Sequence, residues 1–189
     1  MAPPLKVGVA GLGTVGAALL AQIAHQREAL ATRCGRPIDV VAVCARSRTK
    51  DRGVDLKKMR WVVEPSSLSR DPEIDVFVEL IGGEGGVAKE AVEAALSAGK
   101  HVVTANKALL AVHGTEIFAA ARERGVMVAF EAAVAGGIPI IKALREGLTA
   151  NRIEWIAGII NGTTNFILSE MRAKGLDFAA ALKEAQALG

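Results

Sequence analysis

Three glycines spaced as GxGxxG occupy residues 11–16, directly after a short apolar run at residues 6–10 and before an Ala- and Leu-rich stretch typical of a helix. In such a turn the first glycine permits a tight bend, the second lets phosphate approach the backbone, and the third allows close packing of helix on strand. The free N–H groups at the helix start favour an anion. The pattern therefore predicts dinucleotide binding, with a plain strand-to-helix turn as the alternative. The residues predicted to hold the pyrophosphate are Gly11, Gly13, Thr14, Val15 and Gly16.

A second candidate site follows the next apolar run, residues 39–44, at Ala45 and Arg46. NAD-binding folds place an acid here for the ribose 2′-hydroxyl, whereas an arginine here accommodates the 2′-phosphate of NADP. No acid is present at this point, so Arg46 is the candidate phosphate ligand, assisted by Arg48 or Lys50. The sequence therefore favours NADP over NAD, and solvated loop charges are the alternative.

Two more polar segments follow apolar runs of strand length. Ile81 begins a glycine cluster at residues 81–86, which could approach the ribose or nicotinamide side of the cofactor or be a free loop. Thr104 and Lys107 follow the run at residues 101–104. A partly desolvated lysine beside a carbonyl could polarise its oxygen or exchange a proton. Lys107 is therefore a candidate catalytic residue, and a surface lysine is the alternative.

Thr163 and Thr164 lie in the segment Asn-Gly-Thr-Thr-Asn at residues 161–165, between a strand-like run and a helix. Their hydroxyls could cap the helix, and the helix N–H groups could face a substrate carboxylate. The pattern alone does not choose between these functions.

The order of elements predicts how these segments meet. Apolar strand-length runs occur at residues 6–10, 39–44, 61–63, 75–81, 101–104 and 126–130, and amphipathic helical stretches occur at 15–31, 87–98 and 108–124, with Gly99 and Gly125 as terminators. This βαβ alternation predicts a doubly wound parallel sheet of the Rossmann type over residues 1–130. Because ligands bind at the carboxyl edge of such a sheet, the candidate residues should gather there.

Residues 131–189 predict the start of an α+β substrate and dimerisation domain. We expect a helix from Pro139 to about residue 147, a strand at 152–160, and helices at 166–174 and 178–188. These few elements are too small for a self-sufficient domain, so we expect this region to be truncated.

Composition excludes several classes of protein. The 189 residues are 51% apolar and 23% charged, with 4% aromatic residues, which favours an α/β core of aliphatic side chains over disorder. The net charge of +3 comes from scattered residues and predicts no nucleic-acid partner. Cys34 and Cys44 match neither a disulfide framework nor a zinc spacing, and no apolar stretch reaches membrane-spanning length. We therefore expect a soluble, cytoplasmic protein with no membrane partner.

The chain closely resembles the amino-terminal part of the homoserine dehydrogenases. The resemblance rests on GLGTVG at 11–16, ELIGG at 79–83, TANKALL at 104–110, FEAAVAGGIPII at 130–141 and NGTTNFIL at 161–168. The last three motifs, in this order and spacing, are specific to that family. The resemblance implies interconversion of L-homoserine and L-aspartate 4-semialdehyde with NADP(H) or NAD(H), on the way to threonine, isoleucine and methionine. It also implies a homodimer.

The resemblance extends to site residues. It implies that residues 11–16 hold the pyrophosphate, Arg46 the 2′-phosphate, Ile81 the ribose side and Lys107 the nicotinamide end, with Gly189 also in the cofactor site. It further implies a monovalent cation site, for a hard ion such as sodium with a structural role. The matching positions are Glu131, Val134, Gly136 and Ile138.

The chain departs from the family pattern at its end. The family continues beyond Ala-Leu-Gly189 with a Tyr-x-Glu-x-Asp-Pro segment, then an Asp and a Lys that bind the amino alcohol and transfer a proton. One alternative is therefore a non-catalytic module that binds NADPH without turnover. Another is a different enzyme of the same fold that acts on aspartate semialdehyde or a related small metabolite, and the absence of a cysteine near the glycine loops argues against a thiohemiacetal mechanism.

Overall fold

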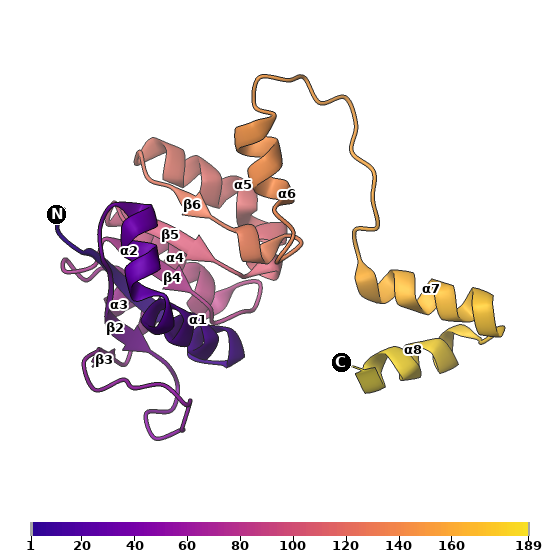
Figure 1. Cartoon of the computed structure of the whole chain (residues 1–189), viewed down its shortest axis with the longest axis horizontal. Helices are drawn as coiled ribbons and strands as arrows, with labels where there is room; N and C mark the ends of the chain where they lie inside the picture. The colour runs from indigo at the N-terminus through magenta and orange to yellow at the C-terminus, as the bar shows by residue number, and fades with distance from the viewer. Residues whose placement is uncertain (1, 189) are drawn as a thin grey trace. The chain divides into compact units, whose positions relative to one another are not determined.

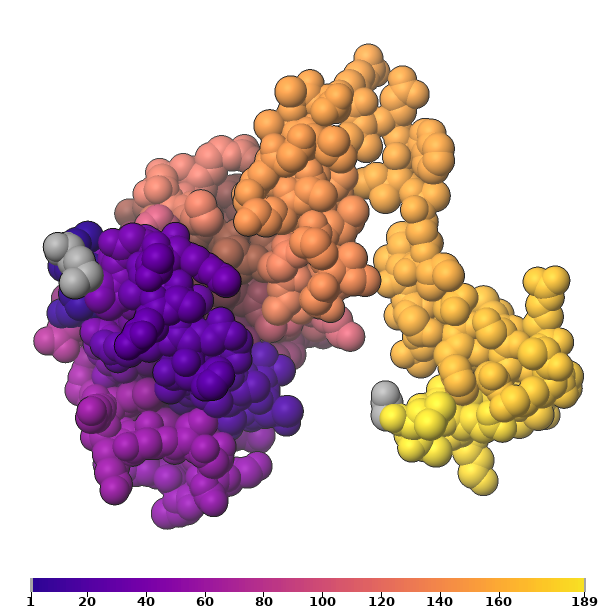
Figure 2. All heavy atoms as spheres, in the orientation of Figure 1, coloured from indigo at the N-terminus to yellow at the C-terminus, as the bar shows by residue number. Residues whose placement is uncertain are grey.

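The computed structural model describes residues 2–188 of the chain, shown in Figures 1 and 2. The chain divides into two compact units, residues 1–142 and residues 143–189. The boundary predicted from the sequence, at residue 130, stays a prediction, and the first compact unit continues to Lys142.

The first unit is built on a parallel sheet of six strands in the order β3-β2-β1-β4-β5-β6 (Figure 1). The strands are β1 (Leu5–Ala10), β2 (Ile38–Cys44), β3 (Arg60–Val62), β4 (Val76–Glu79), β5 (His101–Thr104) and β6 (Val128–Ala129). The chain runs from β1 outwards to β3 and then returns to β4 on the other side of β1. The sequence predicted this doubly wound, Rossmann-like sheet, and the structure confirms it.

Helices connect these strands: α1 (Thr14–His25), α2 (Arg27–Cys34), α3 (Pro65–Ser69), α4 (Gly86–Ser97) and α5 (Lys107–Glu123). The long helix predicted at residues 15–31 is wrong, because the helix breaks at Gln26 and resumes as α2. Gly99 and Gly125 directly follow the caps of α4 and α5 with φ of +69° and +65°, which confirms them as helix terminators. Sequence reasoning missed the short helix α3, which begins at Pro65.

Alternate residues of the buried strands face two hydrophobic clusters on opposite faces of the sheet. Phe77 packs in one cluster with residues of α4 and α5, such as Leu96 and Leu109. Val76 and Val78, its neighbours on β4, pack in the other cluster with Leu20 of α1. Burial on both faces explains why the strands are continuous apolar runs rather than alternating ones.

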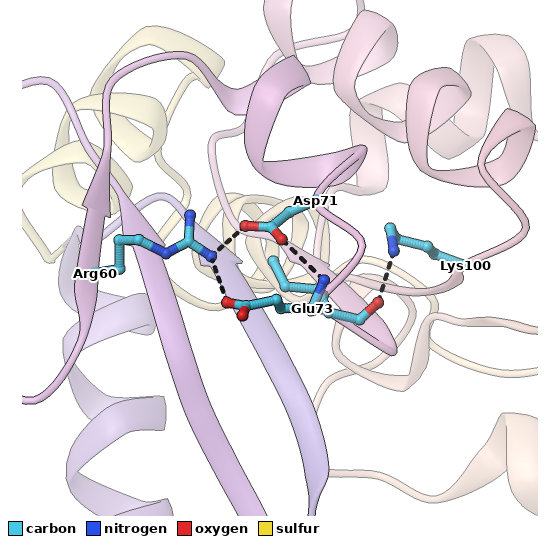
Figure 3. A network of polar contacts seen from close by, with 5 residues as sticks. Arg60, Asp71, Glu73 and Lys100 are labelled. Atoms are coloured by element: carbon cyan, nitrogen blue, oxygen red, sulfur yellow. Dashed lines mark hydrogen bonds and ion pairs between the residues drawn. The ribbon is translucent and has the colours of Figure 1, made fainter.

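A polar network at the amino ends of the strands stabilises the turn before β4 (Figure 3). Arg60 forms ion pairs with Asp71 and with Glu73, the latter at 3.4 Å, and the Asp71 carboxylate accepts the Glu73 N–H at 2.9 Å. Burial opposes ionisation of Asp71, but the Glu73 N–H and the Arg60 guanidinium outweigh it and lower the pKa of Asp71. The buried Lys100 donates to the Ile74 carbonyl at 2.7 Å. These residues lie at the edge of the sheet opposite to the expected ligand edge, so we assign them a structural function.

After β6 the chain forms a short 3₁₀ turn (Glu131–Ala133), α6 (Ile140–Lys142), a π-helical turn (Ala143–Gly147), α7 (Gly162–Lys174) and α8 (Phe178–Leu188). α7 and α8 pack as a helical hairpin, linked by Lys174, which pairs with Glu170 and, at 3.2 Å, with Glu184. Among residues 2–188, no helix is both long and apolar enough to cross a membrane.

The predicted strand at residues 152–160 is wrong, since this segment has no regular secondary structure. A β-strand needs a neighbour for its backbone hydrogen bonds, and no described strand pairs with this segment. Its large apolar side chains are consequently exposed, from 43% at Ile153 to 90% at Ile160. Figure 2 shows the segment, in orange, as a thin run of atoms before α7.

Candidate functional site

A cavity of ≈ 850 Å³ lies at the carboxyl edge of the sheet in the first unit. Its walls come from the glycine-rich loop after β1, the loop after β2, the segment after β3 and the end of β4. Five predicted cofactor residues line it: Gly11, Gly13, Ala45, Arg46 and Ile81. The structure therefore brings together segments that lie far apart in the sequence, at the edge where ligands bind in doubly wound folds.

The three glycines of the GxGxxG segment have different physical reasons to be glycine. Gly11 has a φ of +99°, and a Cβ added there would lie 2.2 Å from the Leu80 carbonyl oxygen. A Cβ on Gly16 would lie 2.0 Å from the Gly11 carbonyl oxygen, so this glycine allows α1 to pack closely on the loop. A Cβ on Gly13 would meet nothing within 4 Å. Gly13 thus leaves an open backbone surface inside the cavity.

The start of α1 beside Gly13 suits an anion. Gly13 is the N-cap of α1 and supplies no side-chain cap, and the first turn contains no acidic residue. Thr14 and Val15 are exposed there, and the N–H groups in the first turn of a helix have no partner within the helix. Uncapped N–H groups and an open glycine fit a pyrophosphate group.

Arg46 and Lys50 line the cavity beyond the end of β2, and both are exposed. The backbone N–H of Lys50 donates to the Ser47 hydroxyl at 3.3 Å, which closes a local turn after Arg46. The third predicted cation, Arg48, does not line the cavity. Of the three cations that the sequence suggested for a 2′-phosphate, only Arg46 and Lys50 line the cavity.

Glu79 at the end of β4 organises the other side of the cavity, and sequence reasoning missed it. Its side chain is fully buried, with 0% exposure. One carboxylate oxygen accepts the N–H groups of Ile81 and Gly82 at 2.7 and 3.0 Å, and the other accepts the Thr104 hydroxyl at 2.6 Å. The signal that could have revealed it is an acid at the end of an otherwise apolar strand. Glu79 thus ties the glycine cluster after β4 to the end of β5.

The predicted polar group after β5 divides into supporting and exposed residues. Thr104 and Asn106 are buried; Thr104 accepts the Asn106 N–H at 2.9 Å, and the Asn106 side-chain amide donates to the Gly83 carbonyl at 2.7 Å. Asn106 is also the N-cap of α5, accepting the Leu109 N–H at 3.1 Å. Lys107, the first residue of α5, is exposed. The network therefore fixes the backbone from which the Lys107 side chain projects.

Cys44 lies beside the glycine-rich loop, which corrects the expectation that no cysteine is near it. It lines the cavity, and its carbonyl accepts the Gly11 N–H at 2.8 Å. Burial and the nearby Glu64 carboxylate raise the pKa of its thiol to about 11, and the thiol donates to the Val63 carbonyl at 3.3 Å. A protonated, hydrogen-bonded thiol is a poor nucleophile. The argument against a thiohemiacetal mechanism therefore rests on the protonation of Cys44, and no longer on the absence of a cysteine.

The predicted cation-site and substrate residues lie outside the cavity lining, as do Thr14, Val15, Gly16, Thr104 and Lys107. Glu131, Val134, Gly136 and Ile138 form an exposed turn in which Ala135 and Gly137 have φ of +51° and +86°, and the Ile138 N–H donates to the Ala135 carbonyl at 2.8 Å. Thr163 and Thr164 are exposed in the first turn of α7, within the second unit. Gly189 lies outside the described residues.

The sequence suggested the two threonine hydroxyls as caps of α7, and this prediction is wrong. The Asn161 side chain is the cap, accepting the Thr164 N–H at 2.8 Å. An asparagine at the N-cap position reaches the N–H three residues later with little strain, whereas residues already inside the helix cannot.

Comparison with known families decides the identity of the fold. The NAD-binding domain of homoserine dehydrogenase matches residues 11–131, and the homoserine dehydrogenase domain matches residues 139–189. The chain belongs to the homoserine dehydrogenase family. The first match contains every cavity-lining residue predicted from the sequence, so the cavity lies in the NAD-binding domain of this family.

Individual homoserine dehydrogenases are similar along nearly the whole chain. The enzyme of Pseudomonas aeruginosa is 58% identical over 98% of this chain and 42% of its own length, and that of Bacillus subtilis is 44% identical over the same shares. A crystal structure of a homoserine dehydrogenase from Thiobacillus denitrificans has a TM-score of 0.88 and 58% identity, covering 98% of this chain and 43% of that one. A hyperthermophilic archaeal homoserine dehydrogenase in complex with NADPH has a TM-score of 0.81 and 28% identity, covering 98% and 61%.

The chain thus spans about 42% of the length of the curated homoserine dehydrogenases that it matches. Residues 11–131 match the NAD-binding domain of this family, and their sheet has the Rossmann-like fold of its solved members.

Proposed function

We propose that this chain supplies the cofactor-binding half of a homoserine dehydrogenase, which interconverts L-homoserine and L-aspartate 4-semialdehyde. The observation that carries the proposal is the cavity at the carboxyl edge, where the glycine-rich loop, Arg46 and the Glu79 network meet in one domain. The test is to supply the complete protein with L-homoserine and NADP+ and to follow the reduced nicotinamide by absorbance. Turnover with L-homoserine supports the proposal, and turnover only with other small alcohols contradicts it.

We infer that the cofactor is NADP(H), with NAD(H) as a weaker alternative. The uncapped start of α1 and the open backbone at Gly13 suit the pyrophosphate, and Arg46 with Lys50 supplies two cations for a 2′-phosphate. When bound, a nicotinamide cofactor would supply hydride transfer to or from the C4 carbon of the substrate. The chain's own contribution is to hold and orient it through these residues.

Lys107 is our candidate catalytic residue, because the network of Thr104 and Asn106 holds its backbone and leaves its side chain exposed. An ammonium group beside the substrate oxygen polarises it and exchanges its proton. We expect Lys107→Ala in the complete protein to lower kcat by about 100-fold or more while the Kd for NADPH changes less than about threefold. Steady-state kinetics and a cofactor titration measure both quantities. If kcat stays unchanged, Lys107 is a surface lysine.

We also propose a structural monovalent cation, such as sodium, at the turn of Glu131, Val134, Gly136 and Ile138. Among the described residues there is no cluster of three His, Cys, Asp or Glu side chains, so a cation here would depend on backbone carbonyls and the single Glu131 carboxylate. Such oxygen ligands suit a hard ion, and the left-handed Ala135 is the kind of strained residue that a bound ion can hold in place.

The cation proposal predicts a salt-specific effect on stability. Replacing sodium with N-methylglucamine at equal ionic strength should lower the melting temperature of the protein by a few degrees, because the ligand binds only the folded state. Glu131→Gln should reduce that difference. Equal melting temperatures in both salts contradict a cation at this turn.

The proposed partners are a small-molecule substrate and a second copy of the complete protein. Trp155, Ile156, Ile159 and Ile160 are each more than 60% exposed, and apolar side chains gathered in this way are typical of surfaces that another chain covers. Sedimentation of the complete protein tests the homodimer, and a monomer at micromolar concentration contradicts it. The exposed free thiol of Cys34 supports a reducing location such as the cytoplasm.

A further inference from the structure

Arg52 connects three segments around the cavity, although nothing in the sequence pattern singled it out. Its Nε donates to the Leu12 carbonyl at 3.1 Å, inside the glycine-rich loop. Its Nη1 donates to the Lys50 carbonyl at 2.7 Å, and its Nη2 donates to the Ser47 carbonyl. The guanidinium carbon lies 5.7 Å from the centre of the Trp61 ring on β3. One half-buried side chain therefore links the glycine-rich loop to the loop that follows Arg46.

Ala45, Val54, Leu56 and Met59 anchor the two ends of the loop after β2 against the hydrophobic core, whereas the stretch between them that carries Arg46 and Lys50 has no such packing. Residues 45–59 contain neither helix nor strand. The other side-chain hydrogen bonds within the loop join near neighbours in sequence, such as the Lys50 N–H to the Ser47 hydroxyl and the Gly53 N–H to the Asp51 carboxylate. A guanidinium is a planar, rigid fork of donors, so three bonds to carbonyls on both loops fix their separation in a way that local turns cannot.

A fixed separation matters because the pyrophosphate and the 2′-phosphate belong to one molecule. The pyrophosphate belongs at Gly13 and the start of α1, whereas the 2′-phosphate belongs at Arg46 and Lys50. If the second loop moves freely, binding must order it, and that ordering cost reduces affinity. The cost falls on the 2′-phosphate in particular, since the glycine-rich loop is built into the sheet edge.

We propose that Arg52, which itself lines the cavity, is a positioning residue: its guanidinium donates to backbone carbonyls of both loops and thereby sets the preference for the 2′-phosphorylated cofactor. It holds the turn carrying Arg46 and Lys50 against Leu12. This inference rests on the proposed NADP site. It predicts that selectivity between NADPH and NADH depends on the shape of the Arg52 side chain as well as on its charge.

The test compares Arg52→Met and Arg52→Lys with the control Arg33→Met, which removes one exposed arginine of α2 on the same domain. Calorimetric titration of each 189-residue chain with NADPH and with NADH gives the ratio of the two dissociation constants. We expect Arg52→Met to raise the Kd for NADPH about tenfold and that for NADH less than about threefold. Arg33→Met should change neither.

Arg52→Lys separates positioning from simple attraction of charge. An ammonium group keeps the charge but cannot reach the carbonyls of Leu12, Ser47 and Lys50 as a fork, so we expect it to lose most of the selectivity as well. Unchanged selectivity in Arg52→Lys, or in a folded Arg52→Met, overturns the inference while leaving the NADP site standing. A parent chain that binds NADPH no better than NADH instead overturns the NADP site itself, and the inference with it.

Discussion

Arg46→Asp is expected to weaken NADPH binding by roughly 100-fold and to leave NADH binding within a fewfold of the parent. Arg46 lines the cavity at the end of β2, and it is exposed with its donors available to a ligand. A charge-assisted pair is worth up to about 3 kcal/mol, which corresponds to roughly 100-fold in affinity. An aspartate at this position also repels the 2′-phosphate, and it can accept the ribose 2′-hydroxyl of NADH.

Fluorescence titration of the chain with NADPH and NADH measures this switch. Arg48→Asp is the matched control, because it makes the same change of charge two residues away at a position that does not line the cavity. The control should weaken NADPH only slightly, through long-range charge that salt screens. If Arg46→Asp weakens the binding of NADPH and NADH equally, Arg46 does not bind the 2′-phosphate.

Gly11→Ala is expected to destabilise the fold, whereas Gly13→Ala is expected to weaken cofactor binding and leave the fold stable. At Gly11 the added methyl group lies 2.2 Å from the Leu80 carbonyl oxygen, and the φ of +99° disfavours any residue with a side chain. We expect Gly11→Ala to lower the free energy of unfolding by ~3 kcal/mol or more, since both the strained backbone and the clash with rigid backbone must be relieved. At Gly13 the methyl group meets nothing within 4 Å, so stability should stay within about 0.5 kcal/mol of the parent.

At Gly13 we expect the substitution to affect NADPH affinity rather than stability. There the methyl group occupies the open surface over which the pyrophosphate approaches, so we expect the Kd for NADPH to rise about tenfold or more without loss of stability. Denaturant unfolding and NADPH titration of the same two variants provide the comparison. Normal NADPH affinity in Gly13→Ala means that the pyrophosphate does not lie over this glycine.

The sheet was predictable because its signal is local and repeated. Each buried strand is a short apolar run, and Gly99 and Gly125 end helices through a backbone conformation that glycine adopts without strain. The same reasoning failed at residues 152–160, where the run has the composition of a strand but no described strand to pair with. Composition shows which secondary structure a segment favours, whereas a β-strand forms only where another strand of the fold lies beside it.

The candidate site was predictable only in part. GxGxxG and Arg46 belong to short motifs that follow strands, so the sequence alone singled them out, and the structure places Gly11, Gly13 and Arg46 in the cavity lining. Glu79 and Arg52 act through contacts that the fold creates. Glu79 meets Thr104 across adjacent strands, and Arg52 reaches back to Leu12. Neither pairing has a signature in sequence spacing.

A crystal structure of this chain grown with NADP+ is the most direct test of the central claim, that the cavity at the carboxyl edge of the first unit is the NADP(H) site. We predict the pyrophosphate over Gly13 within hydrogen-bond distance of the N–H groups at the start of α1, and the 2′-phosphate against Arg46. A cofactor bound elsewhere, or bound in the cavity with its 2′-phosphate turned away from Arg46, would contradict the account.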